Sequence, residues 1–335
     1  MMMSNKIITV FKGDGLGPET VAATLKVLEA AKAPLDYELY EVGAAEYERN
    51  GALIPDAAYE SFERNRLLLK APITTPLGTG FRSLNVTIRT KYDLYANIRP
   101  AKCNDAVETP FKDVDLVIFR ENTEDLYIGK EEKIDDDTYQ AIKLTTRGAS
   151  ERIIRAAFNY AVKYNRKKVT CVHKSNILKM TDGLFRDIFW EIAKEYPAIE
   201  ATDRIVDAMC MDLVMRPNDY DILVMNNLYG DFLSDLASGL IGGLGLLPSA
   251  NIGSDYAMFE AVHGSAPDIA GKGIANPTAL LWSACMLLDY IGEFDVAANI
   301  RQAVDKALHD VDARTPDIGG KGNTETYTNA IISYL

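Results

Sequence analysis

Short apolar runs alternate with segments of helical periodicity along most of the chain, and this alternation restricts the fold more than any other feature of the sequence. The apolar runs have the length of buried strands and lie at residues 6–11, 37–42, 67–70, 116–119, 169–173 and 222–225. Between them, apolar residues recur every three or four positions, which predicts helices at residues 18–33, 148–164, 183–196 and 278–292. This order predicts an α/β fold with a largely parallel or mixed sheet.

The chain of 335 residues is long enough for two domains of ordinary size. No repeat, low-complexity tract or long linker separates two such domains. We therefore expect the chain to pass between them through compact crossings such as the one at Ile98, Arg99 and Pro100.

The charge balance limits the class of partner. Asp and Glu total 48 and Lys and Arg total 36, which gives a formal net charge of −12. Nucleic acids and anionic membranes attract clustered Lys and Arg, so we expect neither as a partner. The four cysteines form no CxxC motif, and the N-terminal residues lack the apolar stretch of a signal peptide. Both features predict reduced thiols and a cytoplasmic location.

A glycine-rich turn, Gly13-Asp14-Gly15-Leu16-Gly17-Pro18, joins the first expected strand to the first expected helix. The dinucleotide-binding motif G-x-G-x-x-G would require glycine at position 18, where this chain has proline. We therefore expect a tight turn, which can still line a ligand site, rather than a Rossmann site.

Three arginines, Arg89, Arg99 and Arg120, stand beside small polar residues in sequence that resembles loops at segment ends. Guanidinium groups bind carboxylates through paired hydrogen bonds, so arginines gathered in one place would bind an acidic small molecule. Each arginine alone could equally belong to a surface ion pair. Lys174 directly follows an apolar run, and near arginines its pKa would fall so that it could act as a base. A plain surface lysine is the alternative.

Carboxylates gather in the second half of the chain. Asp207 follows a short apolar run, while Asp231 and Asp235 are four residues apart and would share one helix face. A few carboxylates with substrate oxygens suit Mg²⁺ or Mn²⁺, although acids in a first helical turn also suit the helix dipole. The segment 263–277, which contains His263, is rich in small residues that let a ligand approach the backbone closely.

Four stretches together resemble the β-decarboxylating dehydrogenases, the family of isocitrate, 3-isopropylmalate, homoisocitrate and tartrate dehydrogenases. They are 95–100 (YANIRP), 120–127 (RENTEDLY), 227–235 (NLYGDFLSD) and 263–277 (HGSAPDIAGKGIANP). The resemblance implies a two-domain α/β fold with a mixed sheet, not a Rossmann fold, and an active site in the cleft between the domains. Residues 1–98 and 253–335 would form the large domain and residues 99–252 the small one. It also implies a homodimer whose small domains lend residues to each other's active sites.

The resemblance further implies oxidative decarboxylation of isocitrate to 2-oxoglutarate and CO₂ with NAD⁺ and Mg²⁺ or Mn²⁺. Arg89, Arg99 and Arg120 would bind the substrate carboxylates. Ser83 and Asn85 match the pattern that recognises the carboxylate specific to isocitrate.

By the same resemblance, Lys174 would help to remove the proton of the C2 hydroxyl in the partner's active site, and Tyr127 would protonate C3 of the enol. The metal would be held by Asp231, Asp235 and Asp207 of the partner subunit.

The resemblance also supplies a cofactor pocket. Leu16 and Thr75 would lie on the nicotinamide side, and the adenosine side would be formed by His263, Gly264, Ser265, Ala266, Asp268, Ile269 and Asn276. Relatives that use NADP carry a lysine and a tyrosine at the positions of Asp268 and Ile269. Asp268 would instead bind the ribose hydroxyls and repel a 2′-phosphate, because like charges about 4 Å apart cost about 1–4 kcal/mol near a surface. The expected cofactor is therefore NAD.

Two alternatives remain from the sequence. The substrate could be homoisocitrate, or 3-isopropylmalate or tartrate, since the assignment to isocitrate depends mainly on Ser83 and Asn85. The chain could also be a non-catalytic regulatory subunit, although such a subunit would be expected to lose some of the catalytic residues that this chain retains.

Overall fold

The computed structural model describes residues 5–74 and 83–335. Within these ranges, ten strands form one mixed sheet in the order β2-β1-β3-β12-β11-β4-β5-β10-β8-β9. The strands are β1 (Lys6–Phe11), β2 (Leu35–Tyr40), β3 (Leu67–Lys70), β4 (Ala96–Lys102), β5 (Asp115–Glu121), β8 (Lys168–His173), β9 (Glu200–Ile205), β10 (Ile222–Met225), β11 (Pro248–Ile252) and β12 (Ala257–Ala261). A separate hairpin consists of β6 (Glu131–Lys133) and β7 (Tyr139–Ala141).

Helices cover the sheet. The α-helices are α1 (Gly17–Ala30), α2 (Ala44–Asn50), α3 (Asp56–Asn65), α4 (Leu84–Lys91), α5 (Arg147–Lys163), α6 (Thr181–Ala193), α7 (Val206–Met215), α8 (Asn227–Leu240), α9 (Thr278–Ile291), α10 (Phe294–Leu308) and α11 (Thr324–Ser333). Short 3₁₀ helices are η1 (Leu126–Ile128), η2 (Pro217–Asp219), η3 (Leu244–Leu246) and η4 (Pro316–Ile318).

The two flanks of the sheet are parallel and its middle is antiparallel. Strands β2, β1, β3 and β12 pair in parallel on one flank, and β5, β10, β8 and β9 on the other. Strands β11 and β4 join the flanks through antiparallel pairs with β12, with each other and with β5. The mixed α/β sheet expected from the sequence is therefore confirmed.

One local expectation was wrong. The second strand begins at Leu35 and ends at Tyr40, two residues earlier than its apolar pattern suggested, because β2 pairs with β1 from Lys6 onwards. Residues Ile98 to Pro100, the expected crossing between domains, lie inside β4, which pairs with both β5 and β11. The sheet runs unbroken through this point, so the division into two domains stays a prediction.

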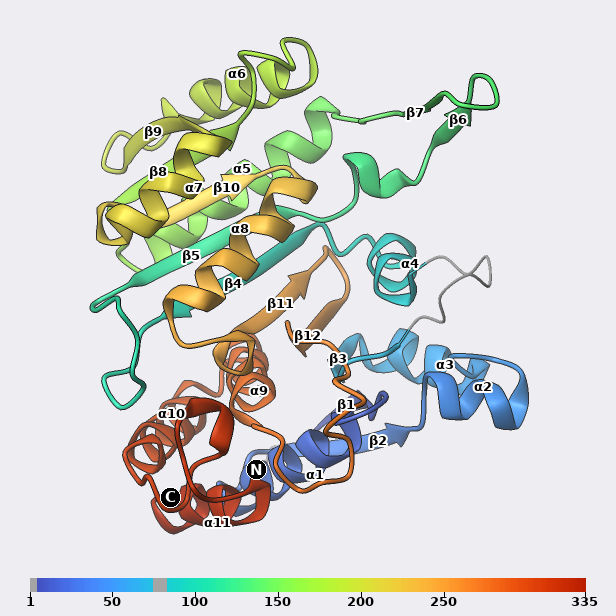
Figure 1. Ribbon diagram of the computed structural model, residues 1–335, viewed down its shortest axis with the longest axis vertical. Helices are drawn as coiled ribbons and strands as arrows, with labels where there is room; N and C mark the ends of the chain where they lie inside the picture. Colours follow the sequence, from blue (N-terminus) through green and yellow to red (C-terminus); the bar gives the residue numbers. More distant parts are fainter. Residues whose placement is uncertain (1–4, 75–82) are drawn as a thin grey trace.

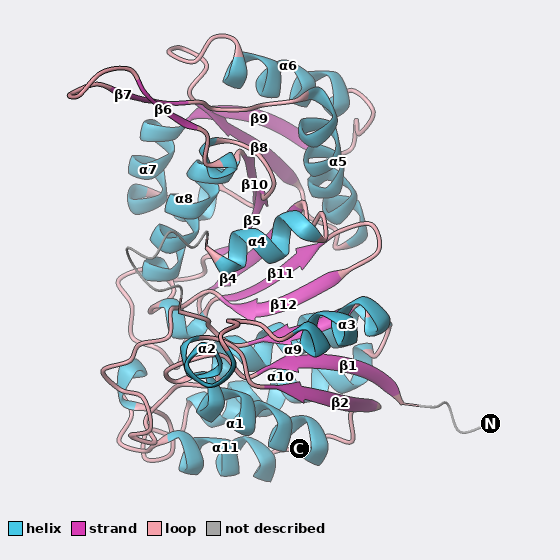
Figure 2. Cartoon of the chain, turned by 90° about the vertical axis from the view of Figure 1, so that its right-hand side faces the viewer, coloured by secondary structure: helices cyan, strands magenta, loops and turns pink. Residues whose placement is uncertain are grey.

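Each flank of the sheet lies between helices (Figures 1 and 2). In the upper half of Figure 2, α5 and α6 cover one face, and α7 and α8 cover the other. In the lower half, α9 packs on β11 and β12 with α1, α10 and α11 behind it, while α3 packs on β1 and β3 from the opposite face. The β6–β7 hairpin projects away from the body in both views.

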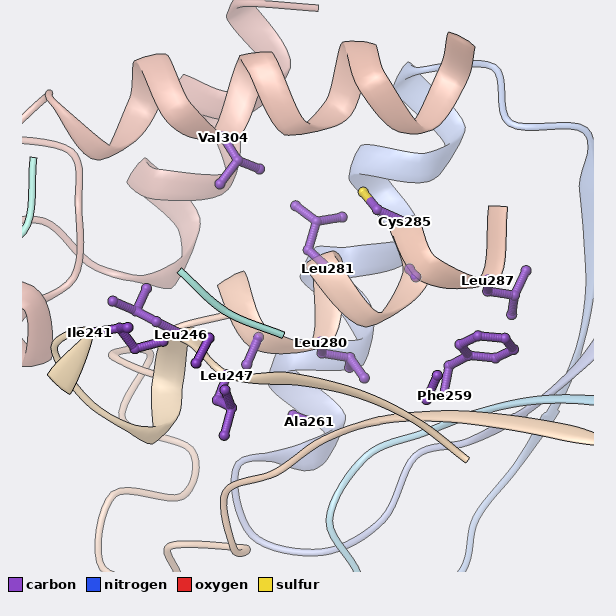
Figure 3. Close-up of a cluster of buried hydrophobic side chains, with 14 of the residues drawn as sticks. Ile241, Leu246, Leu247, Phe259, Ala261, Leu280, Leu281, Cys285, Leu287 and Val304 are labelled. Carbon is purple, nitrogen blue, oxygen red and sulfur yellow. The ribbon is translucent and has the colours of Figure 1, made fainter. Parts of the chain in front are cut away.

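The largest apolar cluster surrounds α9, which is buried along most of its length (Figure 3). Leu281 points from α9 towards Val304 of α10, whereas Leu280 lies on the side of α9 nearer Phe259 of β12. A second cluster, rich in phenylalanine, fills the space between the sheet and the α5–α6 pair. These two cores fix the strands whose ends carry the polar residues described next.

All four cysteines are free thiols. In the described ranges, no helix is both long enough and apolar enough to cross a membrane.

Candidate active site

Several polar side chains converge at one edge of the sheet. In a parallel sheet, ligands bind beyond the carboxyl ends of the strands, because the loops that follow the strands open there. Arg120 is the penultimate residue of β5, Lys174 follows β8 directly, and Asp207 lies two residues after β9. Helix α8, which carries Asp231 and Asp235, follows β10 with one residue between them.

The three arginines expected to bind carboxylates are all buried, with 7 %, 4 % and 1 % of Arg89, Arg99 and Arg120 exposed. They lie in α4, β4 and β5 rather than in the loops that their sequence context suggested. Arg99 donates to the Ser234 hydroxyl at 2.5 Å, and Arg120 donates to Asn227 Oδ1 at 2.9 Å. The alternative of solvated surface ion pairs is thereby excluded for these three residues.

This arrangement concentrates positive charge at a site that is largely shielded from solvent. Burial lowers the pKa of Arg99 to about 9, and the charges of Arg120 and Arg89 add to the effect. Burial and the charge of Arg89 also lower the pKa of Arg120. The Nε atoms of Arg89 and Arg99 are buried without a hydrogen-bond partner among the described residues. Unpaired cationic donors of this kind suit an anionic ligand, whose carboxylates would satisfy them.

Glu260 supplies the main buried counter-charge. This fully buried carboxylate on β12 contacts Lys70 Nζ at 2.7 Å and Arg89 at 2.8 Å. It also accepts a hydrogen bond from Asn251 at 2.9 Å. Burial opposes ionisation, yet Lys70 and Arg89 hold the pKa of Glu260 well below its usual range. The sequence reasoning missed both Lys70 and Glu260, although a charged residue at the end or within an apolar strand is a detectable signal.

Tyr127 and the acids of α8 form a second group beside the arginines. The Tyr127 hydroxyl donates to Asp231 Oδ2 at 2.6 Å, and Arg120 contacts Oδ1 at 2.5 Å. Burial and the bond to Asp231 raise the pKa of Tyr127 to about 12, so the phenol keeps its proton at neutral pH. For Asp231 itself, burial opposes ionisation, but Arg120 and Tyr127 outweigh it and lower its pKa.

The predicted metal ligands fall into two sets. The Asp235 carboxylate makes no hydrogen bond or ion pair with any other described residue, and burial raises its pKa. Asp207 lies apart, with Oδ1 2.6 Å from Nζ of Lys174. In residues 5–74 and 83–335, no three His, Cys, Asp or Glu side chains lie close enough to hold a metal ion within one chain. Asp231 and Asp235 offer the hard oxygen donors that Mg²⁺ and Mn²⁺ take.

Ser83 and Asn85 stand at the start of α4, the helix that also carries Arg89. The Ser83 side chain is exposed and does not cap the helix. Asn85 Oδ1 is buried and has no hydrogen-bond partner among the described residues. An unpaired amide on the arginine-bearing helix is consistent with a ligand contact.

The glycine turn and the small-residue segment meet in space. The Leu16 N–H donates to the carbonyl of Ser265 at 2.9 Å, and the Ser265 and Thr74 hydroxyls lie 2.7 Å apart. A Cβ at Gly15 would lie 1.9 Å from the Ser265 carbonyl oxygen, so only glycine permits this approach. Asp14 fixes the turn by accepting the N–H groups of Ala44 and Thr74.

The remaining cofactor candidates line the same segment. His263 Nε2 is buried without a partner in the described part of the chain, and burial lowers the pKa of the ring. Asn276 donates to Asp317 at 2.9 Å. Asp268 is exposed, while Ile269 donates its N–H to the carbonyl of Ala266. An unpaired ring nitrogen next to exposed backbone, such as that of Gly264, is suited to binding a nucleotide. Thr75, the other predicted contact on the nicotinamide side, lies outside the described residues.

Comparison with known proteins agrees with this geometry. The family model "Isocitrate/isopropylmalate dehydrogenase" matches residues 7–331. The chain belongs to the isocitrate/isopropylmalate dehydrogenase family. A crystal structure of isocitrate dehydrogenase from Methylococcus capsulatus superposes with a TM-score of 0.94 at 51 % identity, covering 98 % of each chain.

Two curated relatives within the isocitrate/isopropylmalate dehydrogenase family differ in the cofactor that their names give. Subunit 2 of the mitochondrial NAD isocitrate dehydrogenase of Schizosaccharomyces pombe is 47 % identical over 99 % of this chain and 88 % of its own length. The NADP isocitrate dehydrogenase of Thermus thermophilus is 49 % identical over 98 % of this chain and 68 % of its own length. Membership of the family and the α/β fold with its mixed sheet, distinct from a Rossmann layout, are confirmed, whereas the individual site residues stay predictions.

Proposed function

We propose that this chain is an NAD-dependent isocitrate dehydrogenase that converts isocitrate to 2-oxoglutarate and CO₂. The observation that carries the proposal is the buried arginine group, in which the Nε atoms of Arg89 and Arg99 have no hydrogen-bond partner among the described residues. A tricarboxylate is the kind of small ligand that could satisfy several buried guanidinium groups at once. The relatives named as isocitrate dehydrogenases support the same substrate.

In this proposal, each residue of the site has a separate task. Arg89, Arg99 and Arg120 bind and orient the carboxylates in surroundings from which water is largely excluded. Tyr127, whose raised pKa keeps it protonated, holds the proton that passes to C3 of the product. Lys174 of the partner subunit helps to remove the proton of the C2 hydroxyl.

Asp231 and Asp235 would hold a divalent cation together with Asp207 of the partner subunit. Mg²⁺ or Mn²⁺, when bound, would stabilise the negative charge that develops on substrate oxygen as CO₂ leaves. The unpaired carboxylate of Asp235 and the absence of a three-ligand cluster within the described part of one chain both support a site completed by a second subunit.

The choice of NAD over NADP rests on Asp268. Its carboxylate is exposed and makes no hydrogen bond or ion pair with any other described residue, so it is available to ribose hydroxyls. A 2′-phosphate there would meet a like charge, which disfavours NADP by about tenfold to thousandfold.

A homodimer completes the proposal. Large apolar side chains stay exposed on adjacent helices: Met211, Val214 and Met215 on α7, and Phe232 on α8. Apolar residues gathered on one face indicate a protein interface. We further propose a cytoplasmic location and a small-molecule substrate, without nucleic acid or membrane partners.

The direct experiment is to purify the single chain and follow isocitrate oxidation and CO₂ release with NAD⁺ and Mg²⁺. We expect NADH and CO₂ to form in equal amounts, and the formation of both to stop when EDTA is added. A folded protein with no activity under these conditions would contradict the proposal and favour a non-catalytic subunit.

A further inference from the structure

A buried ion cluster outside the arginine group holds the end of β8 from which Lys174 emerges. Its centre is the carboxylate of Asp182, which is fully buried in the first turn of α6. Asp182 Oδ1 lies 2.6 Å from Nζ of Lys143. Its Oδ2 accepts the backbone N–H of Lys174 at 2.7 Å and the hydroxyl of Tyr229 at 2.9 Å.

The cluster ties together segments that are far apart in sequence. Lys143 follows the β6–β7 hairpin, and its Nζ lies 4.5 Å from the centre of the Tyr229 ring and 3.7 Å from Asp125. Asp125 in turn accepts the N–H of Leu228 at the start of α8.

Burial of this carboxylate has a physical cost that a neutral residue would avoid. An ionised carboxylate loses its hydration in the interior, and the loss is offset here only because an ammonium group and two donors surround it. Lys174 has a flexible side chain of four carbons, so the position of its Nζ depends on where its backbone is fixed. An error of about 1 Å in the position of a reacting group can cost about 100-fold in rate.

We propose that Asp182, held by Lys143 and Tyr229, is a positioning residue that fixes the backbone of Lys174 and thereby directs its Nζ towards the substrate hydroxyl. This role rests on the proposed function, in which Lys174 is the base. Asp182 itself touches neither substrate nor cofactor.

The opposite end of the same strand offers a matched control. Asp221 accepts the backbone N–H groups of Lys167 and Lys168 at the start of β8, at 2.7 and 3.3 Å. It also pairs with Arg166 at 2.9 Å. Asp221→Asn therefore makes the same chemical change at a carboxylate that anchors β8, but at the end remote from Lys174.

The test is a double-mutant cycle with isocitrate, NAD⁺ and Mg²⁺. We expect Asp182→Asn to lower kcat about tenfold or more, with KM for isocitrate changed by less than about threefold, because the arginines are untouched. In a Lys174→Met background, the same change should lower the residual kcat by no more than about twofold. Asp221→Asn should leave kcat within about twofold of the wild type.

Equal fold-losses from Asp182→Asn in both backgrounds, or an equal loss from Asp221→Asn, would overturn the positioning role alone. A wild-type protein without activity on isocitrate would instead overturn the proposed function. If Asp182→Asn does not fold, Lys143→Met and Lys143→Arg take its place. We then expect a loss of kcat with methionine and recovery with arginine, and equal kcat values for the two would overturn the proposal.

Discussion

The Tyr127 hydroxyl lies 2.6 Å from Asp231 Oδ2, and Arg120 contacts the other oxygen of the same carboxylate at 2.5 Å. One carboxylate thus receives both the proposed proton donor and one of the proposed substrate-binding cations. Because each group responds to the charge on Asp231, the protonated state of Tyr127 and the buried charge of Arg120 are linked.

Tyr127→Phe removes the phenolic hydroxyl, and with it the proposed proton donor and the hydrogen bond to Asp231. We expect kcat for isocitrate to fall by about 10²–10⁴, the usual contribution of general acid catalysis, with little change in KM. Tyr220→Phe is the matched control, since the Tyr220 hydroxyl also donates to a carboxylate, Asp212, at 2.6 Å. Steady-state kinetics on both variants would decide the matter; a similar kcat for the two would contradict the role of Tyr127.

Arg99 should lower the stability of the fold while strengthening the binding of isocitrate. A base whose pKa falls on folding opposes folding at neutral pH, and burial lowers the pKa of Arg99 to about 9. We expect Arg99→Met to raise the free energy of unfolding by about 1–2 kcal/mol while kcat/KM for isocitrate falls by about 100-fold or more. Arg166→Met should instead lower the free energy of unfolding, because it removes the ion pairs with Asp115 and Asp221. Urea unfolding of both variants shows whether the free energy of unfolding rises or falls. A lower free energy of unfolding for Arg99→Met than for the wild type would contradict this expectation.

Glu260→Gln should destabilise the fold, because it leaves Lys70 and Arg89 buried without a full counter-charge. We expect a loss of about 3–5 kcal/mol at neutral pH. The pKa of Glu260 is depressed in the folded state, so its contribution is present above the ordinary carboxyl pKa and is lost as the pH falls through the folded value. The difference from wild type should therefore stay constant from neutral pH to about pH 5 and shrink progressively as the pH falls below that value.

Glu63→Gln serves as the comparison, since Glu63 makes an exposed pair with Lys91 at 3.0 Å. We expect a change below about 0.5 kcal/mol for this exposed pair. If urea unfolding gave the same loss of unfolding free energy for Glu260→Gln and Glu63→Gln, burial would not strengthen the ion pairs of Glu260, and this expectation would be contradicted.

Replacing Asp268 with lysine and Ile269 with tyrosine should shift the cofactor preference. Removing the like charge and adding a cation should lower the ratio of kcat/KM with NAD⁺ to that with NADP⁺ by about 100-fold. Asp295→Lys makes the same charge change at an exposed residue of α10 and should leave the ratio unaltered. An unchanged ratio in the double variant would exclude Asp268 as the determinant.

Much of the fold could be predicted because its strands are apolar and its helices periodic. The strands at 6–11, 67–70 and 222–225 match their apolar runs at both ends. Strand β4 escaped prediction because Asn97, Arg99 and Pro100 interrupt its apolar pattern. Arg99 makes contacts across the sheet that a local pattern does not encode, such as its bond to Ser234.

The candidate site divides in the same way. Motif resemblance located Arg120, Tyr127 and Asp231, and the structure brings these three together. The sequence analysis did not identify Glu260 and Asp182, because the neighbouring sequence does not indicate which residues pair with them. Their partners, Lys70 and Lys143, lie 190 and 39 residues away in the chain, so a local pattern could not pair them.

The central claim concerns the substrate, and its most direct test is kcat/KM of the purified protein for isocitrate, homoisocitrate, 3-isopropylmalate and tartrate with NAD⁺ and Mg²⁺. We expect isocitrate to be preferred by about tenfold or more, since one methylene in the substrate is worth about 1–3 kcal/mol. Equal or better kcat/KM with any of the other three substrates would contradict the assignment.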